Sequence, residues 1–94
     1  MRYTKIVCTI GPACNTDDKI ADLIDAGMNV ARVNFSHGTH EDHAANIARL
    51  RRVSNRMNRP VAILQDLQGP KIRTGWLADH QPVEIVDGAE FMIT

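Results

Sequence analysis

Three short β-rich runs alternate with two helical periodicities up to residue 65 of the chain. The runs cover residues 5–10, 29–35 and 61–65, and a helical pattern lies in each interval. Strands that are joined through helices pair in parallel, with right-handed crossovers. A parallel sheet also needs helices on its faces. The sequence therefore predicts an α/β fold of the form β-α-β-α-β.

Residues that favour helix ends bound the first helix. Asn15 or Thr16 can cap its start, and two aspartates follow at the positive end of the helix dipole. Gly27 is placed to stop the helix. Between these limits, apolar residues recur at spacings of three and four and give one buried face: Ile20, Leu23 and Ile24.

The second helix has its own start and stop signals. Thr39 with Asp42 three residues later resembles a capping box, with Asp in place of the usual Glu. Pro60 is expected to close the helix. Apolar side chains lie between them at helical spacing: Ala44, Ile47, Leu50, Val53 and Met57.

The pattern changes after Gly75. Residues 83–86 and 91–94 are β-rich, and Asp87 with Gly88 forms a turn signal between them, which predicts a β-hairpin. We therefore expect residues 1–74 to belong to one domain, and residues 75–94 to begin an all-β domain that this chain leaves incomplete.

Charge and composition exclude several classes of function. Eleven Lys plus Arg balance eleven Asp plus Glu, so nothing favours nucleic acid or an anionic membrane as a partner. Uncharged stretches reach only about ten residues, against the ~20 that span a bilayer. The first residues lack the pattern of a signal peptide. Cys8 and Cys14 form neither a disulfide scaffold nor a CxxC site. These features favour a reduced, cytoplasmic protein.

Polar residues follow one face of two predicted strands. Arg32, Asn34 and Ser36 alternate with apolar neighbours, and Asp66 follows the third run. Ligands of parallel sheets bind beyond the carboxyl ends of the strands. A guanidinium there suits a phosphate or carboxylate, and the oxygen donors suit a hard cation. The alternative is a polar strand end that only caps a loop.

Histidines and a basic loop carry weaker signals. His37, His40 and His43 are spaced three residues apart, which spreads them around a helix and argues against a zinc site. We expect His40 and His43 to be solvated at the start of the second helix. By composition alone, the basic loop over residues 69–75 indicates a solvated hinge, and it lacks the Gly-Lys-Ser/Thr of a Walker A loop.

Three segments stand out, namely residues 4–13 (TKIVCTIGPA), 26–38 (AGMNVARVNFSHG) and 66–75 (DLQGPKIRTG). In order and spacing, these segments resemble pyruvate kinases. The resemblance covers nearly the whole chain. It implies the first three βα units of a (β/α)₈ TIM barrel, followed by the start of a small β domain that is inserted after the third strand.

The resemblance also implies roles for individual residues. The position of Arg32 binds the substrate phosphate. The nucleotide is contacted from three positions, namely Asn34, His37 and Arg73. A monovalent cation, usually K⁺, is held by Asn34, Ser36, Asp66 and the backbone carbonyl of Leu67. The implied reaction is phosphoryl transfer from phosphoenolpyruvate to ADP, which gives pyruvate and ATP in glycolysis.

Other parts of the implied machinery lie outside this chain. The Mg²⁺ ligands and the catalytic lysine come from later strands, so the chain carries no catalytic residue and is expected to be inactive alone. Lys71 follows Asp66 across a Gly-Pro turn, and we expect its ammonium to replace K⁺. The alternative is a solvated Lys71 with K⁺ bound, and Thr74 resembles the K⁺-dependent type. The whole enzyme is expected to form a homotetramer.

Two other functions remain open on the sequence alone. One is a truncated, non-catalytic module that binds a phosphometabolite or a nucleotide. The other is a non-catalytic piece whose open sheet edge docks onto a partner. Further βα units with a second acidic motif beyond Thr94 would favour the enzyme.

Overall fold

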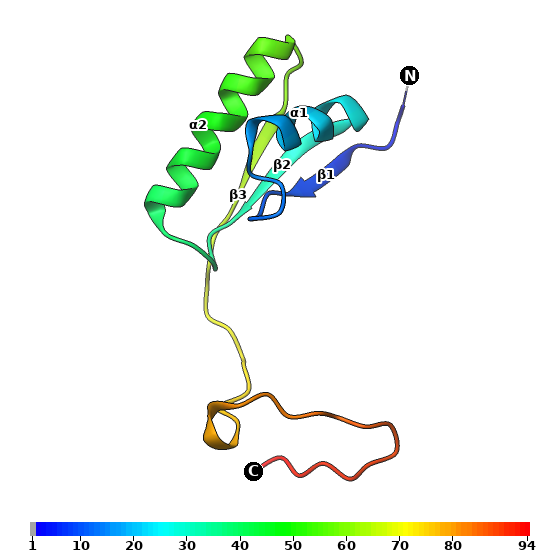
Figure 1. Cartoon of the computed structure of the whole chain (residues 1–94), viewed down its shortest axis with the longest axis vertical. Helices are drawn as coiled ribbons and strands as arrows, with labels where there is room; N and C mark the ends of the chain where they lie inside the picture. Colours follow the sequence, from blue (N-terminus) through cyan, green and yellow to red (C-terminus); the bar gives the residue numbers. More distant parts are fainter. Residues whose placement is uncertain (1) are drawn as a thin grey trace.

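The computed structural model describes residues 2–94, and its first two thirds form a small parallel sheet with two helices (Figure 1). The sheet order is β1-β2-β3, and both pairings are parallel. The α/β class and the β-α-β-α-β order are therefore confirmed. The elements are β1 (Ile6–Thr9), α1 (Asp17–Ala26), β2 (Met28–Asn34), α2 (His40–Met57), β3 (Ala62–Asp66) and the short 3₁₀ helix η1 (Ala78–His80).

Helix α1 begins and ends where the sequence predicts. Thr16 caps it, because its side chain accepts a hydrogen bond from the Lys19 backbone N–H at 3.4 Å. Gly27 ends it in the left-handed conformation, with φ of 116°, which few other residues adopt. The strain-free stop at Gly27 lets the chain turn directly into β2.

Helix α2 begins as predicted and ends slightly earlier. Thr39 and Asp42 form the full capping box, each side chain bonding the other's backbone N–H. The helix stops at Met57, because Asn58 takes a left-handed conformation with φ of 51°. Pro60 lies after this stop, so it prevents continuation and does not itself end the helix.

The core lies on one face of the sheet. Ala31 and Val33 of β2 are buried there under residues of both helices. Val7 and Leu64, which belong to the opposite face, are exposed. The buried set is Ile10, Ile20, Ile24, Met28, Ala31, Val33, Leu50 and Val53. One face of the sheet is therefore covered by helices and the other is bare, and the bare face carries Arg32.

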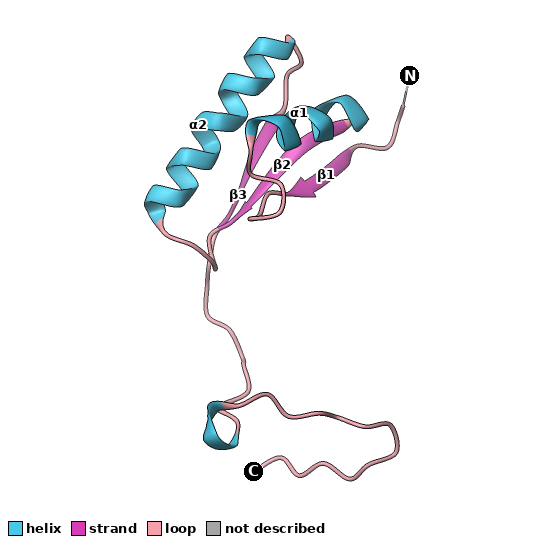
Figure 2. Ribbon diagram, in the orientation of Figure 1, coloured by secondary structure: helices cyan, strands magenta, loops and turns pink. Residues whose placement is uncertain are grey.

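The chain beyond β3 does not pack on the sheet (Figure 2). The predicted hairpin is not formed, since residues 83–86 and 91–94 carry no strand, although Gly88 makes the expected turn at φ of 79°. An isolated two-stranded hairpin is marginal without a third strand or a covering layer. Its apolar residues, such as Ile85 and Met92, are exposed.

The overall dimensions agree with this separation. The radius of gyration is 18.2 Å, whereas a compact chain of this length would have about 12 Å. No helix within residues 2–94 is both long enough and apolar enough to cross a bilayer.

Candidate functional site

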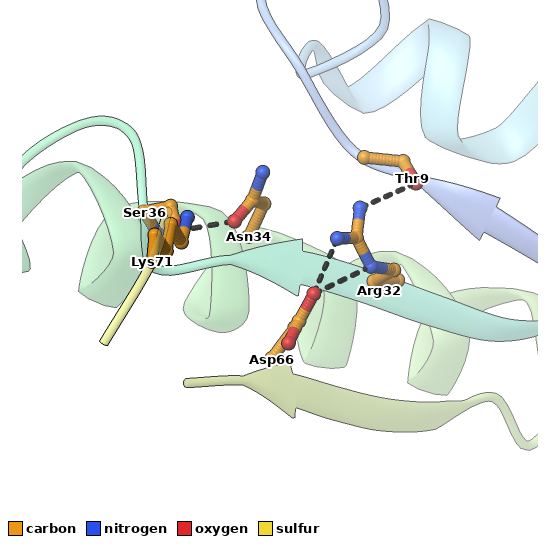
Figure 3. Close-up of polar contacts among 6 residues, drawn as sticks. All are labelled: Thr9, Arg32, Asn34, Ser36, Asp66 and Lys71. Atoms are coloured by element: carbon orange, nitrogen blue, oxygen red, sulfur yellow. Dashed lines mark hydrogen bonds and ion pairs between the residues drawn. The ribbon is translucent and has the colours of Figure 1, made fainter. Parts of the chain in front are cut away.

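Polar side chains gather where the three strands end (Figure 3). Strand register places Thr9 opposite Arg32, and Asn34 opposite Asp66. These side chains lie on the bare face, because the residues that alternate with them on β2 are buried in the core. The structure thus brings Arg32, Asn34 and Asp66 to one edge, as the strand alternation predicts.

Arg32 is held from both neighbouring strands. Its Nε donates to Asp66 Oδ2 at 3.0 Å, and its Nη2 contacts the same oxygen. On the other side, its Nη1 donates to Thr9 Oγ1 at 3.1 Å. The guanidinium has five N–H donors, so these contacts leave one N–H on each terminal nitrogen. Two such donors side by side can bind two oxygens of one phosphate.

The Arg32–Asp66 pair remains partly open to solvent. The side chain of Arg32 is 32% exposed and that of Asp66 is 41% exposed. A pair with this exposure contributes little net stability, because water screens it. Its effect is mainly to orient the guanidinium.

Ser36 lies in the turn that follows β2, which ends at Asn34, one residue before the predicted limit at Phe35. The Phe35 N–H still bonds the Asp66 carbonyl at 2.9 Å, which is the last link to β3. The Ser36 N–H then turns back to Asn34 Oδ1 at 3.0 Å, and the His37 N–H bonds the Asn34 carbonyl at 3.3 Å. The Asn34 side chain ends the strand by competing for the next backbone donor.

Lys71 returns from the loop after β3 to this turn. Its Nζ donates to Ser36 Oγ at 2.5 Å, although the two residues are 35 positions apart. The basic loop is therefore joined to the site at this residue. Residues 69–75 are nevertheless all exposed, as in a solvated hinge, so the contact joins one exposed side chain to the turn.

Three of the oxygens expected to hold K⁺ already accept hydrogen bonds from the protein. Asn34 Oδ1 accepts from the Ser36 N–H, and Ser36 Oγ accepts from Lys71. Asp66 Oδ2 accepts from Arg32. Each of these side chains keeps a further oxygen lone pair, so the contacts leave room for a cation beside the protein donors.

A cavity of about 670 Å³ lies beside the strand ends, between the β1–α1 loop and α2. The sequence did not predict this cavity, because no local pattern indicates a space between a loop and a helix that are distant in the sequence. Asn34 and His37 line it, together with Pro12, Asn46 and Arg49. Its volume is in the range of small-molecule sites.

Two further residues predicted for the site follow β3. Leu67 comes directly after Asp66, Arg73 lies six residues further along the chain, and both are exposed. Among residues 2–94, Arg73 forms no hydrogen bond or ion pair with another side chain. Arg73 is therefore not brought together with Asn34 and His37. The described residues also contain no group of three or more His, Cys, Asp or Glu side chains placed to hold a metal ion.

Asp42 gives the cavity wall a carboxylate. The Thr39 backbone N–H donates to it at 3.1 Å and lowers the pKa of Asp42, and the Thr39 hydroxyl lowers it further. Away from the cavity, a hydrogen bond from Arg52 lowers the pKa of Asp17.

His43 is buried, which corrects the prediction that it is solvated. The residue is 7% exposed and lines the cavity, whereas His40 is exposed as predicted. The helical spacing in the sequence already indicates that His43 is buried. Position 43 begins the series 43, 47, 50, 53 and 57, which is the buried stripe of α2, whereas Ala44 is exposed.

Comparisons with known proteins agree on one family. The family model described as pyruvate kinase, barrel domain, matches residues 1–94. A pyruvate kinase from Geobacillus stearothermophilus is 50% identical over 93 residues, which is 99% of this chain and 16% of that protein. One from Staphylococcus aureus (strain USA300) is 51% identical over 94 residues, again 16% of its length. The chain thus spans about one sixth of the curated relatives it matches.

Proposed function

The chain belongs to the pyruvate kinase family, and we propose that the full-length protein transfers a phosphoryl group from phosphoenolpyruvate to ADP. The products are pyruvate and ATP. In this proposal, β1 to β3 are the first three strands of a (β/α)₈ barrel. Residues 75–94 begin an inserted β domain, whose hairpin forms only when the rest of that domain covers it.

The orientation of Arg32 is the observation that carries the proposal. Phosphoryl transfer depends mainly on positioning and on neutralising the charge of the transferred group. Arg32 is fixed between Asp66 and Thr9 and keeps one N–H on each terminal nitrogen. A guanidinium held in this way can bind the phosphate of phosphoenolpyruvate through both nitrogens.

The cavity offers space for a nucleotide beside the phosphate that Arg32 would bind. Asn34 and His37, two of the three residues expected to contact ADP, line its wall. Arg73 completes this set when the segment after β3 is held by the inserted domain. His37 is exposed and therefore accessible to a ligand.

Lys71 takes the place of the monovalent cation in our proposal. Its ammonium is close to K⁺ in size, carries the same charge, and already contacts Ser36. A cation tethered to the chain loses less entropy on binding than a free ion does. We propose that the enzyme does not require K⁺.

Mg²⁺ would be held by residues that this chain does not contain. Its chemistry is the neutralisation of phosphate charge during transfer. The contribution of this chain to the same neutralisation is Arg32, which would bind and orient the phosphate. A cytoplasmic location and a homotetramer are further proposals that rest on family membership.

The test is a direct assay of the full-length protein. Purified enzyme is mixed with phosphoenolpyruvate, ADP and Mg²⁺, and pyruvate formation is followed by a coupled reaction. We expect turnover that needs both substrates. Tight binding of either substrate without pyruvate formation would instead favour a non-catalytic binding module.

A further inference from the structure

Among residues 2–94, His43 is the one buried polar residue, and the proposed function does not use it. It lies in the first turn of α2 and is 7% exposed. Within the described part of the chain, neither Nδ1 nor Nε2 has a hydrogen-bond partner. A buried polar group without a partner costs free energy, so its position needs an explanation in terms of what the ring contacts.

The ring of His43 is stacked on Phe35. The two ring centroids are 4.2 Å apart, and the planes are inclined by 19°. Phe35 lies between Asn34 and Ser36, at the point where β2 becomes the turn. By contrast, the ring of His40 is 6.3 Å from Phe35 and tilted by 50°. The imidazole of His43 therefore supports the start of the turn, whereas that of His40 does not.

The same ring also supports the end of the turn. A Cβ atom built on Gly38 would lie 3.3 Å from His43 Cε1. Gly38 has φ of 78°, so the backbone passes close over the imidazole in a conformation that suits glycine. The ring is thus stacked on the first residue of the segment 35–38 and lies close to the last one.

The first turn of α2, which carries His43, is held by several hydrogen bonds. The His43 N–H bonds the Thr39 carbonyl at 3.1 Å, which starts the α2 ladder. The capping box of Thr39 and Asp42 fixes the same turn of helix. A side chain on this turn can hold the segment above it in one place.

We propose that His43 is a positioning residue for the nucleotide. Its flat ring, stacked on Phe35 and packed under Gly38, fixes the turn that presents Asn34 and His37 to the cavity. This inference rests on the proposed function, since it concerns the same nucleotide site. Arg32 is held separately, by Asp66 and Thr9, so the proposal predicts an effect on ADP and little effect on phosphoenolpyruvate.

The contacts of the ring use its faces and edge and not its nitrogens. Phenylalanine has a ring of similar shape and no polar atoms to leave unpaired. His43→Phe is therefore expected to keep the turn in place and to stabilise the fold slightly. His43→Ala removes the stack and leaves the turn unsupported.

The experiment measures steady-state kinetics of the full-length enzyme with three variants. We expect His43→Ala to raise KM for ADP about tenfold or more, since small displacements of binding groups have large effects. The kcat and the KM for phosphoenolpyruvate should change much less. His43→Phe should restore the KM for ADP, and the matched control His40→Ala should behave as the unmutated enzyme. If His43→Ala does not fold, His43→Leu, which fills the volume without a flat ring, replaces it with the same expectation.

Two results would overturn the inference. One is an equal rise in KM for ADP in the Phe and Ala variants, which would mean that the nitrogens act. The other is a lower Tm for His43→Ala with an unchanged KM for ADP, which would mean a purely structural role. Calorimetric measurement of ADP binding by the same proteins tests the His43 inference separately from the proposed function. An unmutated enzyme that binds ADP without turnover contradicts only the proposed function, and the calorimetric affinities of the variants then decide on His43.

Discussion

Arg32 combines two demands that usually conflict at a strand end. It has to be fixed, which Asp66 and Thr9 achieve, and it has to keep donors free for a ligand. The fork of the guanidinium meets both demands, because its five donors point in three directions. A lysine at this position could pair with Asp66 or bind a phosphate, but its single nitrogen cannot form the two parallel N–H···O bonds that a guanidinium forms.

Replacing Arg32 with Lys tests whether the guanidinium is needed to bind the phosphate. We expect kcat/KM for phosphoenolpyruvate to fall by the equivalent of about 2–4 kcal/mol of transition-state stabilisation. The Tm should hardly change, because the ion pair is partly exposed and Lys can still meet Asp66. Steady-state kinetics and thermal unfolding of the full-length enzyme measure both quantities.

Arg52→Lys is the matched control for that substitution. Arg52 also pairs with an aspartate, Asp17, but it lies between the helices and away from the strand ends. Its kinetics should be those of the unmutated enzyme. Near-normal kinetics and a lowered Tm in Arg32→Lys would show that Arg32 is only a structural partner of Asp66.

At the scale of elements, helix and strand positions follow from local signals, but the turn and cavity do not. The caps at Thr16, Gly27 and Thr39 are where the sequence places them, since capping is a contact between near neighbours. The burial of His43 follows from its place in the apolar series of α2, but no local rule joins its ring to Phe35 and Gly38. The hairpin after residue 82 fails for a related reason, because its strands need a layer that this chain does not supply.

The contact between α1 and α2 has a pH dependence that can be predicted. A hydrogen bond from Arg52 lowers the pKa of Asp17 below 3.8 in the folded protein. A carboxyl with a lowered folded pKa stabilises the protein above its unfolded pKa, and this stabilisation is lost as pH falls through the folded value. Asp17→Asn should therefore lower Tm near neutral pH.

The same variant should differ less from the unmutated protein in acid. We expect the gap in Tm to narrow as pH falls below 3.8, since the unmutated Asp17 then also loses its charge. Thermal unfolding of both full-length proteins across this range measures the gap. A gap that stays constant with pH would show that the charge of Asp17 does not contribute.

The whole chain as given leaves one sheet face bare and its last segment unpacked. Val7 and Leu64 are exposed on that face, and the strands β1 and β3 are both edges. Exposed edges and apolar faces favour association of chains. In a (β/α)₈ barrel the same face would point to the interior, where the remaining strands cover it.

We therefore expect the isolated 94-residue chain to be molten or aggregated and to show no kinase activity. Gel filtration, near-UV circular dichroism and a thermal scan of the purified chain measure this. A monomer with a cooperative unfolding transition would contradict the prediction, as would pyruvate formation above background.

We propose that these strand ends form a pyruvate kinase site in which Lys71 replaces K⁺. The most direct measurement is the rate of pyruvate formation by the full-length enzyme against added K⁺, with a large inert cation holding the ionic strength. We predict full activity without K⁺ and a flat response, while Lys71→Glu becomes K⁺-dependent. An unmutated enzyme that forms pyruvate only when K⁺ is added would contradict this proposal. An enzyme that forms no pyruvate, whatever the K⁺ concentration, would contradict it as well.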